Sequence, residues 1–156
     1  MKKLITLISV GMLIIGLGVQ FPQARDNTDK PYSYTFTSSD YRSYQKTSGR
    51  RKYNDSCLYM NYETGNIAYT AYALGGYSIN SATEPCQTDP STGQSYYYIF
   101  YPGYKRFMYN YIMEKGKTYA AINAYTTNAG GNASGVWSPD SVYEDGVATP
   151  DDYIRE

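Results

Sequence analysis

The sequence contains no histidine among its 156 residues. Histidine is the usual general base near neutral pH and the commonest metal ligand in proteins. Its absence excludes Ser-His-Asp and Cys-His nucleophile systems, helical zinc-protease motifs and most zinc sites. We therefore expect no metal site and no cofactor, and any catalysis would depend on other groups, such as paired carboxylates or tyrosine.

Acidic residues are absent from the interiors of the predicted strands. Glu63, Glu84 and Glu114 fall in predicted turns, and most of the other acidic residues cluster towards the two ends of the chain. A glycosidase needs two carboxyl groups held roughly 5–10 Å apart on rigid elements. This distribution predicts that the protein has no catalytic residues and is not an enzyme, with a carboxylate-based hydrolase as the remaining alternative.

The chain also lacks an excess of charge of either sign. Its 14 basic and 14 acidic residues balance, and loss of Lys2 and Lys3 with a cleaved leader would give a net charge of −2. Nucleic-acid binders usually carry a basic face, and binding to an anionic membrane needs a similar one. We expect no nucleic-acid partner.

The sequence has one long apolar run, from Leu4 to Val19, preceded by Lys2 and Lys3. A basic start followed by such a run is typical of a secretory signal peptide. As a helix the run would reach about 24 Å, short of the roughly 30 Å hydrocarbon core of a bilayer. The sequence predicts a signal peptide over residues 1–24 and a secreted or cell-surface protein that meets the membrane only through this segment. An uncleaved anchor is the alternative.

Cysteine is scarce, with only Cys57 and Cys86. An even number of cysteines in an exported chain predicts a disulfide. Closing a loop of about 30 residues would stabilise the fold by roughly 3–4 kcal/mol in the chain-entropy model.

Tyrosine is abundant, with 21 residues that lie mostly in short alternating segments. Residues 32–37 place Tyr32, Tyr34 and Phe36 on one face of a strand, because successive side chains of a strand point to opposite faces. Residues 57–62 and 67–74 predict a hairpin that ends at Gly75-Gly76. Further strands are expected at 96–101, 104–113, 118–126 and 133–138, with a long polar loop at 80–95.

Turns that recur between short β segments predict an all-β fold, a small antiparallel sandwich or barrel of about six to eight strands. We place this β domain at residues 32–139. A polar leader at 25–31 precedes it and an acidic tail at 140–156 follows it, and we expect both to be loosely ordered.

The stretch that runs from Gly116-Lys117-Thr118-Tyr119-Ala120-Ala121-Ile122 to Gly135-Val136-Trp137-Ser138-Pro139-Asp140-Ser141 spans 26 of the 156 residues, about a sixth of the chain. The chain resembles a group of largely uncharacterised small secreted β proteins of Gram-positive bacteria that end in a Gly-x-Trp-Ser-Pro-Asp-Ser segment. The resemblance implies export and a β fold, and it implies no activity.

The tyrosine content favours binding over catalysis. Tyrosine combines a rigid apolar face with a hydroxyl group and is common on recognition surfaces. We expect several tyrosines to face water and to stack on a cell-wall polysaccharide or on a surface protein. The candidate binding residues are Tyr96, Tyr98, Tyr101, Tyr104 and Trp137.

Two other classes of function remain open from the sequence. A bacteriocin-like membrane-active protein would also be small, exported and aromatic, although it usually needs a basic amphipathic surface. A structural matrix component would pair tyrosine-rich edge strands between molecules.

Overall fold

The computed structural model describes residues 25–38, 42–127 and 129–154, and the predicted signal peptide lies outside these ranges. Strands, turns and loops make up the described residues, which contain no helix. Consequently no helix in these ranges is long and apolar enough to cross a membrane.

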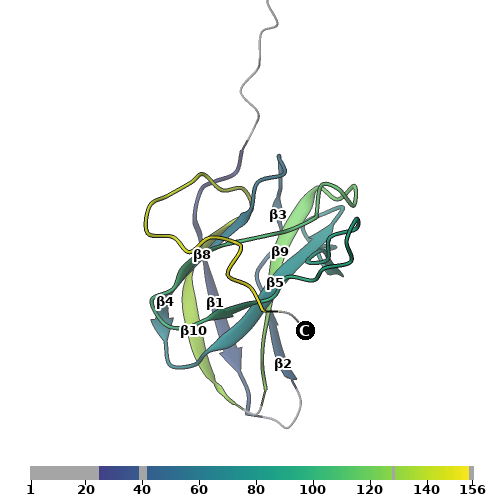
Figure 1. The fold of residues 1–156 in the computed structure, drawn as a ribbon. Helices are drawn as coiled ribbons and strands as arrows, with labels where there is room; N and C mark the ends of the chain where they lie inside the picture. The colour runs from purple at the N-terminus through teal and green to yellow at the C-terminus, as the bar shows by residue number, and fades with distance from the viewer. Residues whose placement is uncertain (1–24, 39–41, 128, 155–156) are drawn as a thin grey trace, which may run out of the picture.

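The described strands form two antiparallel sheets that face each other and do not close into a barrel (Figure 1). The first sheet has the order β1 (Lys30–Phe36), β10 (Gly131–Ser138), β4 (Leu58–Gly65) and β8 (Lys105–Met108). The second has the order β2 (Arg42–Lys46), β9 (Tyr119–Thr127), β5 (Tyr69–Gly76) and β6 (Glu84–Pro85). In addition, β3 (Arg50–Arg51) pairs with β9, and β7 (Tyr98–Phe100) pairs with β5. The all-β prediction is confirmed. The described strands number ten, because β2, β3 and β6 lie in segments where the sequence pattern predicted no strand.

The core between the two sheets is built largely from aromatic rings. As predicted, Tyr32, Tyr34 and Phe36 of β1 all point inward. Tyr34 meets Tyr69 of the opposite sheet edge to face at a centroid distance of 5.7 Å, and Tyr69 stacks on Phe100 at 5.4 Å. Small alanines on the inner face of β9 leave room for these rings, so large and small side chains interdigitate.

The predicted hairpin at residues 57–74 is wrong, because β4 and β5 belong to different sheets. The turn between them is an arch that carries the chain from one sheet to the other. The buried Tyr62 hydroxyl holds this arch by donating to Ile67 O at 2.9 Å and accepting from Ile67 N at 3.3 Å. Gly75 and Gly76 are the last two residues of β5, so this strand ends at the glycine pair as predicted. A Cβ at Gly76 would lie 2.0 Å from the backbone oxygen of Ser81, so the chain approaches too closely for a side chain.

The predicted strand at 104–113 is only partly present, since β8 ends at Met108. The following backbone leaves the sheet because other groups take its hydrogen bonds. Tyr109 N donates to the Tyr98 hydroxyl at 2.9 Å, and Tyr111 N donates to Cys86 O at 2.8 Å.

The predicted disulfide is not formed, since Cys57 and Cys86 are both free thiols in the structure. Cys86 is buried in the main core between the sheets. Cys57 packs against a separate cluster on the outer side of the first sheet, made by Tyr59, Phe107 and Val147. The disulfide prediction failed because the number of cysteines does not show whether two of them lie in the same part of the fold.

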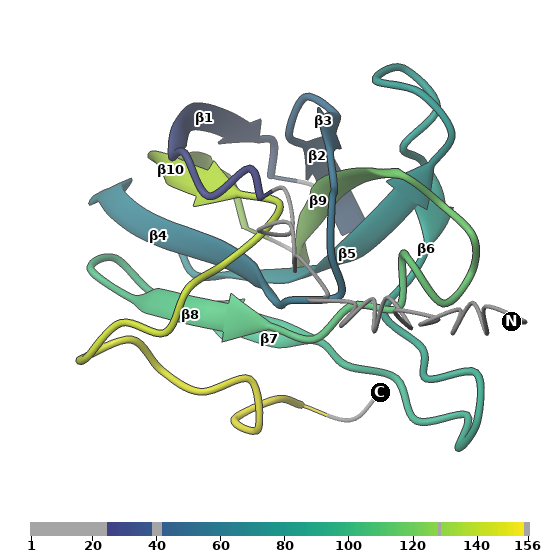
Figure 2. The ribbon, with the colours of Figure 1, turned by 90° about the horizontal axis from the view of Figure 1, so that it is seen from above.

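The two ends of the described chain pack against the sheets instead of being loosely ordered. Asp26 of the leader forms an ion pair with Arg50, with its Oδ1 2.6 Å from Nη2. The part of the chain beyond residue 140 runs beside β8 and β7, as the view from above shows (Figure 2). Val147 in this part is buried against Tyr59 and Phe107.

Candidate functional site

Two of the five candidate binding residues, Tyr98 and Trp137, are fully buried and present no surface to a ligand. Both sit on inward-pointing positions, Tyr98 on β7 and Trp137 on β10. The Tyr98 hydroxyl donates to Pro150 O at 3.0 Å. The alternation that places every second residue of β7 inward therefore removes Tyr98 from the surface.

The other three candidates lie on the surface in two groups. Tyr96 is half-buried and packs edge to face on Tyr109 and Tyr153, with centroid distances of 5.0 and 4.6 Å. Tyr101 and Tyr104 are 45% and 44% exposed and meet edge to face at 5.1 Å across the turn between β7 and β8. Of the five, only Tyr101 and Tyr104 offer large open ring surfaces.

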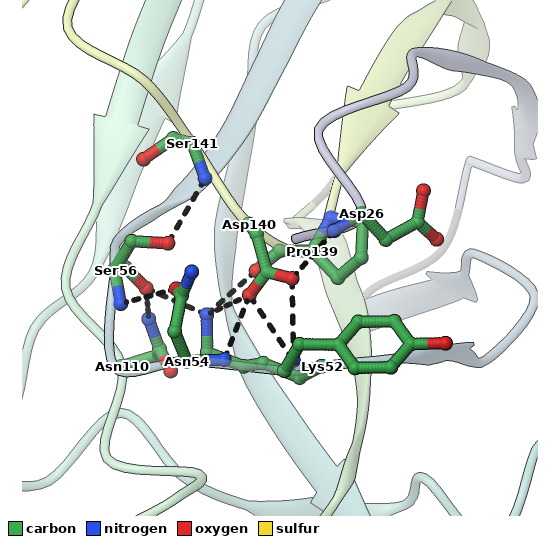
Figure 3. A network of polar contacts seen from close by, with 9 residues as sticks. Asp26, Lys52, Asn54, Ser56, Asn110, Pro139, Asp140 and Ser141 are labelled. Atoms are coloured by element: carbon green, nitrogen blue, oxygen red, sulfur yellow. Dashed lines mark hydrogen bonds and ion pairs between the residues drawn. The ribbon is translucent and has the colours of Figure 1, made fainter. Parts of the chain in front are cut away.

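The most densely hydrogen-bonded charged group is a clasp formed by Lys52 and Asp140, whose side chains are both completely buried (Figure 3). Lys52 Nζ donates to Ser56 O and Pro139 O at 2.6 Å each and lies 3.3 Å from Asp140 Oδ1. Asp140 also accepts hydrogen bonds from the backbone N–H groups of three residues, Asp26, Tyr53 and Asn54.

The chemistry of the clasp is structural. Burial lowers the pKa of Lys52, and the neighbouring Asp140 carboxylate opposes that shift. Because neither side chain is exposed, no ligand reaches either group. The clasp fixes the leader, the segment after β3 and the end of β10 to one another.

The outer side of the six-stranded sheet carries a different kind of surface. Since Ala120, Ile122 and Ala124 of β9 point into the core, the residues between them point outward. Strand register then aligns one outward row across four strands, with Tyr44 beside Tyr125, Tyr125 beside Thr70, and Thr70 beside Ile99. At roughly 4.8 Å per strand this row spans about 14 Å.

We call the aromatic part of this surface the tyrosine face, which consists of Tyr44, Tyr72, Tyr97 and Tyr125. The rings follow one another with centroid distances of 5.6 Å from Tyr44 to Tyr125, 6.4 Å on to Tyr72 and 5.4 Å on to Tyr97. Tyr44 is 51% exposed, whereas Tyr125 is only 4% exposed, so the neighbouring side chains cover most of the Tyr125 ring. The Arg42 guanidinium lies 4.3 Å from the centre of the Tyr125 ring, a cation–π distance.

Next to these rings the surface is hollowed into a groove of about 290 Å³. Thr70 and Ile99 lie between Tyr125 and Tyr101 in this groove, and Thr126 and Thr127 add hydroxyl groups to its lining. Apolar ring surface and hydroxyl groups therefore converge in one concave place, as they do in small-molecule sites generally.

A second, smaller cavity of about 130 Å³ lies on the outer side of the four-stranded sheet. Its lining includes Asp29, Tyr59, Ser138 and Glu144. Burial, followed by the charge of Glu144, raises the pKa of Asp29. Burial, and then the charges of Glu144 and Asp29, raise the pKa of Tyr59 to about 12. The sequence did not predict this pair of carboxylates, because it becomes visible only once β1 and β10 are known to be neighbours.

Residues 21–141 match the family described as Protein of unknown function (DUF2712). The chain belongs to this family. All the described strands of this DUF2712 chain fall inside the match, as do the tyrosine face, the groove and the clasp. Residues 142–154, which include Glu144, fall beyond it. No curated protein and no solved structure matches the chain.

The tyrosine face was missed as a set by reasoning from sequence. Tyr44, Tyr72 and Tyr125 each occur in an alternating segment, and this alternation indicates a strand. It does not indicate which of the two faces of the strand points outward. The pairing of β2, β9 and β5 was needed to bring these three tyrosines onto one face of the sheet.

Proposed function

We propose that this protein is an exported, non-catalytic binding protein that acts at the cell surface or outside the cell and holds a polysaccharide in the groove beside the tyrosine face. The observation that carries this proposal is the groove between Tyr101 and Tyr125, with Thr70 and Ile99 between them. The predicted signal peptide supports the location.

The chemistry of the groove suits a sugar ring. A pyranose has an apolar C–H face and a rim of hydroxyl groups, so it stacks on an aromatic ring while its rim makes hydrogen bonds. Tyr44 and Tyr101 supply exposed ring faces, and Thr70 and Thr127 supply hydroxyl groups at the same surface. Tyr44 lies on the paired strand β2, and Tyr101 directly follows β7 and packs on Tyr104, so little side-chain order has to be gained on binding.

The alternative ligand is a surface protein, which would use the same rings as anchors. The material that retains the protein distinguishes a polysaccharide ligand from a protein ligand. A polysaccharide ligand predicts retention on purified cell wall stripped of protein, and a protein ligand predicts loss of retention after that treatment.

The binding test compares retention of the full chain on purified cell wall and on isolated polysaccharides. We expect Tyr101→Ala and Tyr44→Ala to weaken binding by about tenfold each, which corresponds to roughly 1.4 kcal/mol. Tyr77→Ala is the matched control, since Tyr77 is 64% exposed but lies outside the tyrosine face. Equal loss in all three variants, or no retention of the wild type, would contradict the proposal.

The same incubations separate the other classes of function. If the wild type shortens the polysaccharide and the Asp29→Asn variant does not, the result would favour the carboxylate-based hydrolase. Its active site would then be the cavity lined by Asp29 and Glu144. Leakage of dye from anionic vesicles would favour a membrane-active protein, and fibre formation would favour a matrix component.

A further inference from the structure

The strands β7 and β8 form one side of the sandwich, and each has a single partner strand among the described strands. β7 pairs with β5 of the second sheet, and β8 pairs with β4 of the first. A strand with one free edge presents unpaired N–H and C=O groups that another extended chain can use.

Residues 147–154, which we call the C-terminal segment, occupy both free edges (Figure 2). Along β8, Phe107 N donates to Ala148 O and Ala148 N donates to Lys105 O, both at 3.0 Å. Beside β7, Ile154 N donates to Tyr97 O at 2.8 Å. The segment therefore meets the two edges at one isolated bridge each, Ala148 parallel to Arg106 of β8 and Ile154 antiparallel to Tyr97 just before β7.

Side chains from the same two strands and the turn after β8 hold the segment between these points. Arg106 Nη1 donates to Asp152 O at 2.8 Å, and its Nη2 lies 2.5 Å from Asp152 Oδ2. The Tyr109 hydroxyl donates to Asp151 Oδ1 at 2.7 Å. Arg106 is only 5% exposed, and its buried Nε has no hydrogen-bond partner among the described residues. The site is thus built for an extended acidic segment, and its guanidinium still has a donor to spare.

The link between this segment and the rest of the chain is exposed. The clasp fixes Asp140, and the chain becomes buried again at Val147. Between these anchors Val142 and Tyr143 are 49% and 80% exposed, and Gly146 has a φ of +79°, a left-handed conformation. We call residues 141–146 the hinge.

We propose that the C-terminal segment is exchanged between two copies of the chain, so that each copy's residues 147–154 occupy the β7 and β8 edges of the other. Every contact described above is kept in such a dimer, because the same groups meet in either arrangement. The hinge changes conformation and gives up its own contacts, the hydrogen bond from Ser141 N to Ser56 Oγ at 3.0 Å and the exposed Lys105–Glu144 ion pair at 3.6 Å. Val142 and Tyr143, which face water in the monomer, gain apolar partners where the two hinges cross.

Hinge length tests the exchange, with light scattering on the full chain over a range of concentrations. We expect the wild type to show a dimer that grows with concentration. Deleting Tyr143, Glu144 and Asp145 prevents the segment from reaching its own edges and should lower the dimer dissociation constant by at least about tenfold. Inserting three Gly-Ser pairs after Tyr143 should raise it by a similar factor.

Two results overturn the proposal. One is a wild type that remains monomeric at all concentrations, which leaves the edges to each chain's own segment or to a foreign one. The other is a wild-type dimer whose dissociation constant does not change in the lengthened variant, since a dimer formed through any other surface is insensitive to the hinge. The lengthened variant keeps the test decisive even if the shortened one fails to fold.

Discussion

At the scale of single residues, burial decides what each polar group contributes. Lys52 and Asp140 are both inaccessible to water, and each charge is compensated only by the other and by backbone groups. Removing one member of such a pair leaves the other charge buried without compensation, which costs more than the pair itself contributes.

We expect Lys52→Met to lower the free energy of unfolding by about 3–5 kcal/mol, because the Asp140 carboxylate is left buried and unpaired. Urea denaturation measures the loss. Arg51→Met is the matched control. Arg51 is next to Lys52 in the chain, but its side chain is exposed, so this substitution should change the free energy of unfolding by less than about 0.5 kcal/mol. Equal stability of the two variants would show that the clasp is not a structural centre.

Predictability from the sequence also differs from residue to residue. Period-two alternation was sufficient for Tyr32, Tyr34 and Phe36, which are buried as predicted. It failed for Tyr98 because residues 96–101 are large aromatic or apolar residues at every position, so no alternation shows which of them point inward. In such a run only the neighbouring strands decide which rings face the core.

At the scale of elements, the arch between β4 and β5 determines the topology. A loop of this length usually makes a hairpin, but here the two strands separate into different sheets. Tyr62 replaces the missing ladder hydrogen bonds by bonding both Ile67 O and Ile67 N. A local sequence pattern does not reveal a side chain in this role.

We expect Tyr62→Phe to destabilise the protein by about 1–3 kcal/mol, since the buried Ile67 groups lose their partner while the ring is kept. Tyr101→Phe, at an exposed ring, should cost less than about 0.5 kcal/mol. Thermal or urea unfolding of both variants makes the comparison. A similar cost for the two changes would mean that the arch does not depend on this hydroxyl.

At the scale of the whole molecule, the excess of tyrosine makes the fold sensitive to alkali. Burial raises the pKa of Tyr34, Tyr69 and Tyr98 above the ordinary value of 10.0. A group whose pKa is raised by folding stabilises the protein fully below its unfolded pKa, and this contribution is lost as the pH rises above that value.

We therefore expect ultraviolet titration of the phenols to show two phases. Phenols in water ionise near pH 10, and Tyr34, Tyr69 and Tyr98 should ionise only at higher pH, together with the loss of near-ultraviolet circular dichroism. Reversible ionisation of every tyrosine in a folded protein would contradict the aromatic core.

The all-β class could be predicted at this scale because turn spacing and tyrosine alternation agree along the chain. The tyrosine face and the carboxylate cavity could not, since each depends on strands that are distant in sequence becoming neighbours. Tyr44 reaches Thr70 only through β9, and Asp29 reaches Glu144 only because β1 lies beside β10.

The clasp also determines how the molecule would respond to mechanical tension. Asp26 N lies 2.8 Å from Asp140 Oδ2, just outside the first pair of the β1–β10 ladder, Lys30 opposite Trp137. A force that pulls on both ends would first detach residues 147–154 from β7 and β8, and would then load this latch before any pair of the β1–β10 ladder. Once the latch opened, β1 would peel from β10 one pair at a time, so Asp140 guards the point at which the sandwich begins to open.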